Sequence, residues 1–287
     1  MSIEVVQLLC YPVKSCAGIA LDRAAVSAAG LPWDRHWMIV SNDGVFLTQR
    51  QVPRMALIGT ALDDTHLTLT APGMKPLRIG LFDGCDLPQT LVTVWQAQVP
   101  AHDLAGAASV WLSQALGTPC SLFRVAQPLT RQPNAAWVEA WSQRQDDGTA
   151  PEDNGFGFAD GFPLLVANSA SLDALNARLK EKGVAPVDMR RFRPNIVIDG
   201  LDAFEEDNVD ALRFGDLRLG LVKSCTRCAV PDVDPDTGVR LTEPGITLAT
   251  FRKFEAGILF GENAIVAEGE GAELRVGSAG EAEYTFR

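Results

Sequence analysis

Short apolar segments, separated by residues that favour turns, most strongly limit how the first third of this chain can fold. Apolar or alternating side chains occupy residues 3–11, 38–40, 56–62 and 67–70. Glycine, proline, asparagine and aspartate interrupt these segments, as in Asn42-Asp43-Gly44. Many short strands at this spacing are typical of β-barrels and β-sandwiches. The pattern therefore predicts an N-terminal third built from β-strands.

The rest of the chain combines two helical segments with further β segments. One helix is predicted at residues 103–116, with Asp103 as the N-cap and Gly117 as the C-cap. A second is predicted at residues 171–182, where three leucines form one apolar face. Strands are predicted at residues 121–126, 163–167, 195–198, 212–222 and 263–268. We expect a mainly β fold with a few helices, of the α+β class, in two β-rich units.

Residues 127–158 show little periodicity and are rich in Gln, Asn, Asp, Gly and Pro. This composition predicts a long, mobile surface connection. The segment also contains Trp137 and Trp141, which argue against plain disorder.

Length and composition exclude several classes of protein. A chain of 287 residues fits one large domain or two of ordinary size. With 47% hydrophobic and 21% charged residues it is not disordered or fibrous, and no apolar run reaches the roughly 18 residues of a spanning helix. The net charge of −11 argues against broad nucleic-acid binding. The acidic N-terminus is unlike a secretory signal, and the six cysteines are scattered, so we expect reduced thiols and a cytoplasmic location.

The strongest chemical signal is the pair Cys225 and Cys228, which follows the predicted strand at residues 212–222. A turn sequence begins at Asp234, so we expect both cysteines on a loop. Arg227 lies between them, and a neighbouring cation favours the thiolate, which binds metals or acts as a nucleophile. Too few further ligands are near for structural zinc, and no helix follows as in thioredoxin. Two buried cysteines beside a turn remain an open alternative.

Three further segments carry positive charge in this acidic chain. Three arginines, ending at Arg193, precede the strand at residues 195–198, and arginine binds phosphate through paired hydrogen bonds. Lys14 and Ser15 follow the first predicted strand and together can hold an anion. Arg35 lies in a tryptophan-rich segment. Taken alone, each segment is more typical of a solvated loop or of an aromatic cluster with a salt bridge.

In order along nearly the whole chain, these motifs resemble those of the MOSC proteins. They are Tyr11-Pro-Val-Lys-Ser-Cys16, Asp34-Arg35-x-Trp37, Phe192-Arg-Pro-Asn-Ile-Val197, Cys225-x-Arg-Cys228 with Val233-Asp-Pro-Asp-Thr-Gly238, and Phe260-Gly-Glu-Asn263. The chain is most similar to the branch with an N-terminal β-barrel region, which includes the mitochondrial amidoxime-reducing components and bacterial relatives. The resemblance implies an N-terminal region at residues 1–122 and a MOSC domain at residues 123–287, with residues 1–35 packed against the C-terminal barrel.

The resemblance also implies a binding site for molybdenum cofactor, a pyranopterin dithiolene with a phosphate. Cys228 would be the molybdenum ligand and a catalytic residue, in agreement with the preference of soft metals for thiolates. Asp160 matches an acidic residue near the metal and is the second catalytic candidate. Gly161 and Phe162 stand where animal members carry hydroxyl residues. The pterin and its phosphate would be held by Lys14, Ser15, Arg35, Arg193, Asn195, Thr226 and Arg227.

By this resemblance the protein is an oxidoreductase that reduces N-hydroxylated small molecules at the N–O bond. The chain shows neither the membrane anchor of animal relatives nor the four-cysteine iron–sulfur motif of some bacterial ones. We therefore expect electrons from a separate flavin or iron–sulfur protein, and no membrane or nucleic-acid partner. The alternative is a carrier that hands on the cofactor, or sulfur on Cys228, without turnover of its own.

Overall fold

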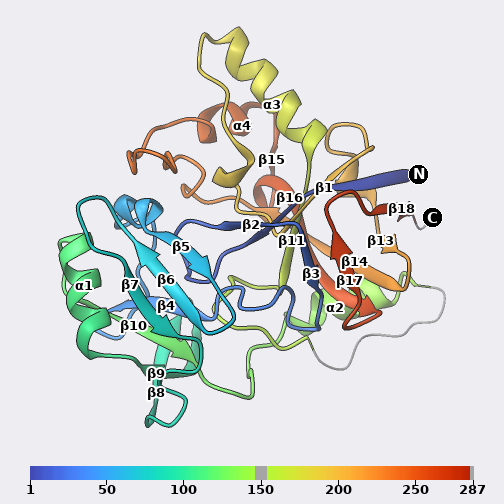
Figure 1. The fold of residues 1–287 in the computed structure, drawn as a ribbon. Coiled ribbons are helices and arrows are strands. Elements are labelled where there is room, and N and C mark those ends of the chain that lie inside the picture. Colours follow the sequence, from blue (N-terminus) through green and yellow to red (C-terminus); the bar gives the residue numbers. More distant parts are fainter. Residues whose placement is uncertain (146–153, 285–287) are drawn as a thin grey trace.

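The computed structural model describes residues 1–145 and 154–284 and is mainly β, as the sequence predicts. Figure 1 shows two β-rich units, one made largely by the first part of the chain and one by the rest. The first strand, β1 (Ser2–Cys10), belongs to the second unit, where the two chain ends lie side by side. The predicted fold class is therefore confirmed.

A closed barrel forms the centre of the C-terminal unit. Its strands within the described residues are, in spatial order, β11 (Leu164–Asn168), β12 (Ile196–Asp199), β1, β18 (Ala279–Glu283), β13 (Ala211–Phe214), β14 (Leu217–Thr226) and β16 (Gly257–Glu268). Pairing between β11 and β16 closes the ring. Shorter strands pair at its edges, namely β2 (Ile19–Leu21), β15 (Lys253–Phe254), and β3 (Arg23–Ala25) with β17 (Glu273–Arg275).

The N-terminal unit contains two antiparallel sheets and one helix among the described residues. One sheet has the order β4 (Trp37–Ser41), β10 (Cys120–Val125), β9 (Ala97–Asp103) and β8 (Gln89–Val94). The other consists of β5 (Gly59–Leu62), β6 (His66–Thr70) and β7 (Leu77–Gly80). The helix α1 (Gly106–Leu116) packs on these sheets and shares their apolar core.

The alternation of side chains along β1 explains its place in the barrel. Ile3 and Val5 are buried in the barrel core, whereas Ser2 and Glu4 face outward. The strand pairs with β12 on one side and β18 on the other, so the start of the chain is part of the C-terminal barrel. After β1, Val13 pairs with Trp37 in an isolated parallel β-bridge, and the chain continues into the N-terminal unit. The division between residues 122 and 123 stays a prediction.

Three helices accompany the barrel in the described residues, α2 (Ala135–Ser142), α3 (Ser169–Glu181) and α4 (Gly245–Phe251), with the short 3-10 turns η2 (Met189–Arg191) and η3 (Glu205–Asn208). A third 3-10 turn, η1 (Pro53–Leu57), lies in the N-terminal unit, where Met55 is part of the core. The helix predicted at residues 171–182 is α3, and the side chain of Asn168 caps it by accepting a hydrogen bond from the Ala170 amide. The helix predicted from Asp103 begins later, at Gly106, because Asp103 is paired with Phe123 in the sheet.

Other predicted boundaries are wrong where turns intervene. The run at residues 212–222 is two strands, β13 and β14, joined by a turn at Gly215, whose φ is +60°. Part of residues 56–62 belongs to η1, so β5 begins only at Gly59. The expected connection at residues 127–158 contains α2, whose Trp141 is fully buried. Residues 146–153 of that segment lie outside the described residues.

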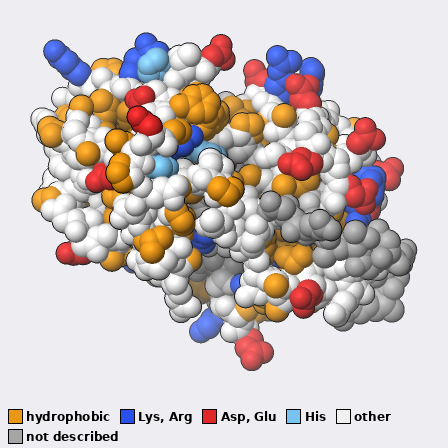
Figure 2. All heavy atoms as spheres, turned by 90° about the horizontal axis from the view of Figure 1, so that it is seen from below, with side chains coloured by type: hydrophobic (Ala, Val, Ile, Leu, Met, Phe, Trp, Pro, Cys, Tyr) orange, Lys and Arg blue, Asp and Glu red, His pale blue; other side chains and the backbone are white. Residues whose placement is uncertain are grey.

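No helix in the described parts of the chain is long and apolar enough to cross a membrane. On the face shown in Figure 2, acidic and basic side chains lie mostly around the edge, with hydrophobic side chains scattered among polar ones. Scattered apolar residues are usual on the surfaces of folded proteins.

The pairing of β14 with β16 buries one carboxyl group, that of Glu262, which lies opposite Ser224. The side chain is 4% exposed, and its Oε1 atom has no hydrogen-bond partner. Burial raises the pKa of Glu262 to about 8, although hydrogen bonding from Ser224 opposes the shift. The folded protein therefore keeps this group protonated near neutral pH, whereas an unfolded chain releases the proton near pH 4.5.

This difference predicts a loss of stability with rising pH that Glu262→Gln removes. Between about pH 4.5 and 8 the folded state binds more protons than the unfolded state, so the free energy of unfolding falls as pH rises. Each pKa unit corresponds to about 1.4 kcal/mol, so the variant should be more stable at pH 8 by on the order of a few kcal/mol. Urea unfolding at pH 5 and pH 8 measures this. The control is Glu255→Gln, at an exposed position; an unchanged pH slope in Glu262→Gln would contradict the assignment.

Candidate functional site

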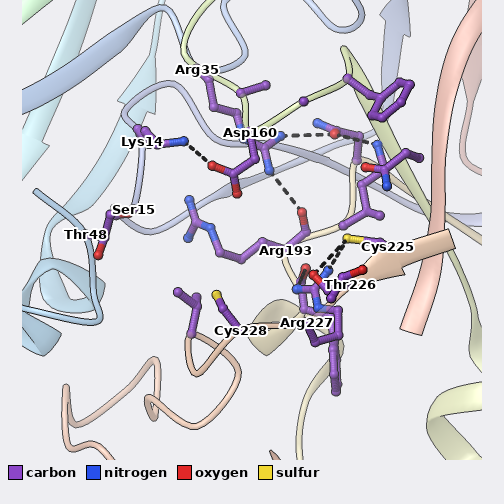
Figure 3. Close-up of a pocket in the computed structure, with 18 of the residues that line it drawn as sticks. Lys14, Ser15, Arg35, Thr48, Asp160, Arg193, Cys225, Thr226, Arg227 and Cys228 are labelled. Atoms are coloured by element: carbon purple, nitrogen blue, oxygen red, sulfur yellow. Dashed lines mark hydrogen bonds and ion pairs between the residues drawn. The ribbon is translucent and has the colours of Figure 1, made fainter. Parts of the chain in front are cut away.

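One pocket contains every site residue predicted from the sequence. Its lining includes Lys14, Ser15, Arg35, Asp160, Arg193, Asn195, Thr226, Arg227 and Cys228. These residues come from five separate segments of the chain, and Figure 3 shows Lys14, Asp160 and Arg193 directed toward the same space, with Cys228 across from Lys14. The fold thus brings together residues that the sequence could only connect by resemblance.

Strained backbone is concentrated at this pocket. In the described residues, seven non-glycine residues have positive φ, and four of them line the pocket, namely Ser15 (66°), Arg35 (49°), Trp95 (57°) and Arg193 (56°). Such conformations cost on the order of 1–3 kcal/mol each and persist where the surroundings enforce them. Their gathering at one place makes this pocket the candidate functional site.

Two arginines that line the pocket stack on one buried tyrosine. The guanidinium carbons of Arg35 and Arg193 lie 4.5 and 4.2 Å from the centre of the Tyr11 ring. Arg35 pairs with Asp34, but Arg193 has no ion pair in the described residues and donates from Nη1 to the Cys16 carbonyl at 2.6 Å. Its buried Nη2 atom has no partner. Burial lowers the pKa of Arg193 to about 10, so this site favours an added negative charge.

Asn195 connects the two stacked arginines to the barrel. Its Oδ1 atom accepts hydrogen bonds from Arg35 Nη1 at 3.0 Å and from the Leu165 amide at 3.1 Å, and its Nδ2 atom donates to the Leu9 carbonyl. Because Leu9 and Leu165 lie on β1 and β11, the side chain ties both strands to the pocket. Arg35 also donates to the Arg193 carbonyl at 3.1 Å, which fixes the two arginines relative to one another.

The other two arginines of the 190–193 cluster do not line the pocket. Arg190 makes two hydrogen bonds of 3.1 Å to Asp236, and Arg191 pairs with Asp234 at 2.7 Å. Both therefore brace the turn that follows the cysteine motif. Only Arg193 reaches the pocket, which refines the sequence prediction for this cluster.

Lys14 and Asp160 form an ion pair between the two units. The buried Lys14 Nζ donates to Asp160 Oδ1 at 2.5 Å and to the Phe158 carbonyl at 2.8 Å. Burial lowers the pKa of Lys14, with Asp160 acting in the opposite direction. Desolvation in the pocket would raise the pKa of Asp160, but Lys14 and the indole of Trp95 outweigh it and hold that pKa below its usual range. Asp160 is therefore ionised near neutral pH.

The cysteine motif lies at the end of β14, and its two thiols differ. Cys225 is inside the strand and half-buried, so the prediction that both cysteines lie on a loop is wrong for this residue. Arg227 Nη1 donates to its sulfur at 3.0 Å, and Arg227 Nη2 donates to the Phe192 carbonyl at 2.7 Å. Burial raises the pKa of Cys225, although Arg227 opposes this. Cys228, past the strand end, is exposed within the pocket lining.

Two cysteines line the pocket, of which Cys228 is the exposed one, together with several cationic side chains. Among the described residues, no group of three or more His, Cys, Asp or Glu side chains could hold a metal ion. A metal here would need other ligands brought with it, as a metal carried by an organic cofactor has. The cationic side chains around Cys228 suit a ligand with an anionic group.

Sequence reasoning missed several lining residues, including Thr48, Arg50 and Trp95. Thr48 and Arg50 follow β4, and Trp95 lies at the turn between β8 and β9. None belongs to a motif with a chemical signature. The one signal in the sequence was a tryptophan between two alternating apolar segments, and its exposure is seen only in the structure.

Comparison with known proteins gives two domain matches and a consistent set of relatives. The MOSC N-terminal beta barrel domain matches residues 2–119, and the MOSC domain matches residues 153–280. Mitochondrial amidoxime-reducing component 1 of Mus musculus is 33% identical over 253 residues, covering 86% of this chain and 71% of that protein. The human protein of the same name is 34% identical, covering 87% of this chain and 72% of its own length. The Xenopus laevis protein is 34% identical, with 88% and 72% covered.

Proposed function

The chain belongs to the MOSC family, and from this premise we propose that it is a molybdenum-cofactor oxidoreductase acting on N-hydroxylated small molecules. The proposed reaction reduces the N–O bond, consuming two electrons and two protons and releasing water. The observation that carries the proposal is the gathering of an exposed thiol and several cations in one strained pocket. The names of the relatives, amidoxime-reducing components, support the substrate class.

The residues present fit this cofactor. Arg193 offers a buried N–H without a partner, and such an unsatisfied donor costs about 1–3 kcal/mol unless a ligand pairs with it. A second buried N–H without a partner, Nε of Arg227, lies beside the cysteine motif. The cofactor's phosphate and pterin would supply acceptors for both. The proposed contacts are Lys14, Ser15, Arg35, Arg193, Asn195, Thr226 and Arg227, with Cys228 as the molybdenum ligand.

When bound, the cofactor supplies the redox chemistry for N–O cleavage, and the chain supplies ligation, orientation and proton control. Cys228 is accessible from the pocket, whereas Cys225 stays a protonated thiol because burial raises its pKa. Cys225 therefore shapes the motif through its contact with Arg227. This unequal pair supports Cys228 as the ligand.

Lys14 and Asp160 supply proton control in this proposal. An ammonium has three N–H groups, and Phe158 and Asp160 use two of those on Lys14, leaving one for a ligand. The lowered pKa of Lys14 makes it a better proton donor than an ordinary lysine. Asp160 stays ionised near neutral pH, so it accepts a hydrogen bond from Lys14 and orients it without donating a proton of its own.

Electrons come from a separate flavin or iron–sulfur protein in this proposal, and the proposed location is the cytoplasm. The relatives are named for mitochondria, so cell fractionation tests the location. The second candidate function is a carrier of the cofactor or of sulfur. The exposed Cys228 thiol favours it, because an accessible thiol can hand on a bound group.

The test uses protein purified from a host that makes molybdenum cofactor. Molybdenum and pterin contents are measured first, and benzamidoxime reduction is then followed with a flavin and iron–sulfur electron donor. About one molybdenum per chain with donor-dependent turnover supports the oxidoreductase. Bound molybdenum that is passed to an apoenzyme without turnover supports the cofactor carrier. The absence of both metal and pterin contradicts the oxidoreductase and the cofactor carrier, and leaves only a carrier of sulfur on Cys228.

A further inference from the structure

Trp95 lines the pocket and is not among the residues that we propose hold the cofactor. It lies at the β8–β9 turn, its side chain is 45% exposed, and it lines the same pocket as Cys228. Its φ of 57° is a left-handed conformation that a bulky residue rarely adopts. The indole Nε1 donates to Asp160 Oδ1 at 3.0 Å. A large exposed ring is thus held in a fixed direction at a cost in backbone strain, which points to a ligand contact.

Arg50 and Phe46 fix the ring further. The guanidinium carbon of Arg50 lies 4.4 Å from the Trp95 ring centre, and Phe46 meets the indole edge-to-face at 5.3 Å. Arg50 also donates from Nε to Thr48 Oγ1 at 3.3 Å and has no carboxylate partner in the described parts of the chain. The planar guanidinium and the indole together offer flat, partly exposed surfaces, and aromatic ligands stack on both kinds of surface.

We propose that Trp95 and Arg50 form a substrate subsite for a flat aromatic ring, so that aromatic N-hydroxylated compounds are preferred over aliphatic ones. This inference rests on the proposed function for its substrate class. The ring would stack at this subsite while the N–O group is directed toward Cys228, which lines the same pocket. Stacking of one ring on an aromatic side chain changes affinity by roughly tenfold.

The experiment compares benzamidoxime with acetamidoxime, which carries the same reacting group without a ring. In Trp95→Ala, the ratio of kcat/KM for benzamidoxime to that for acetamidoxime should fall about tenfold, mainly through KM. Trp95→Phe keeps a ring but removes the hydrogen bond to Asp160, so its ratio should stay within about twofold of wild type. A defect caused only by the lost hydrogen bond would lower kcat/KM for both substrates by the same factor, so the ratio would not change. Trp137→Ala removes another exposed tryptophan, outside this pocket, and is the matched control.

Equilibrium binding of both amidoximes to the oxidised protein, without electron donor, gives a readout independent of turnover. Weaker binding of benzamidoxime alone in Trp95→Ala supports the subsite even if the wild type fails to reduce either compound, a result that would contradict only the proposed function. Equal losses for both compounds, or unchanged benzamidoxime binding, overturn the subsite. An unchanged ratio with a raised KM for the electron donor also overturns it, because Trp95 would then contact the donor.

Discussion

Cys228→Ser is expected to abolish the reduction of N-hydroxylated substrates while leaving the fold intact. Serine replaces a soft thiolate with a hard, mostly protonated hydroxyl, which is a poor ligand for molybdenum. Residues that only orient metal ligands already change activity by 10–100-fold, so loss of the ligand itself should reduce kcat to less than about one hundredth. Because Cys228 is exposed and outside the core, the free energy of unfolding should change little. Turnover and molybdenum content measure the effect.

Cys225→Ser is the matched control. It keeps side-chain size and an acceptor for Arg227, whose Nη1 lies 3.0 Å from the Cys225 sulfur. Much of the activity should therefore remain. In Cys228→Ser the pterin should stay bound through its phosphate contacts even though turnover is lost. Equal damage in both variants, or full activity in Cys228→Ser, would remove the ligand assignment and return the pair to a redox or structural role.

Arg193→Ala is expected to release the cofactor. The variant removes the buried guanidinium that has no ion pair in the described residues and that we propose pairs with the phosphate. Hydrogen bonds to charged groups contribute about 1.5–3 kcal/mol, so the dissociation constant should rise roughly 10- to 150-fold. Pterin and molybdenum per chain after gel filtration are the measurement.

Arg190→Ala is the control for charge, since it lies in the same cluster but pairs with Asp236 outside the pocket. It should retain the cofactor at the wild-type level. Urea unfolding of both variants separates loss of the ligand from loss of the fold. Equal cofactor content in Arg193→Ala and wild type would take Arg193 out of the site.

Local patterns predicted most of the strands, because alternation reports directly which side chains face a core. Residues 3–11 are an example, since buried Ile3 and Val5 alternate with outward-facing Ser2 and Glu4 in β1. The same patterns misplaced the start of α1. Asp103 has the chemistry of a helix cap, but its backbone is used by the pairing of β9 with β10, which only the tertiary structure determines.

The pocket residues also fall into two groups, those that the sequence predicted and those that it did not. Lys14, Arg35 and Arg193 were found from motifs, but their meeting depends on β1 entering a barrel made by the other end of the chain. No periodicity encodes that pairing. Trp95 was missed because its importance comes from contacts with Arg50 and Asp160, each far from it in sequence. Such residues are recognised only once the distances between segments are known.

The closure of the barrel sets the order of events during synthesis. β1 is made first, and β2 can pair with its end at once, but β12 and β18, which pair with the rest of it, are made only after residues 195 and 278. Pairings between such distant segments form slowly, because the chain loses conformational entropy in closing a long loop before the stabilising contacts between the strands form. The N-terminal unit can fold on its own strands beforehand, but the pocket needs Lys14 and Cys228 together. Insertion of the proposed cofactor is therefore expected to follow translation, because the barrel that carries the pocket stays open until β18 pairs with β1.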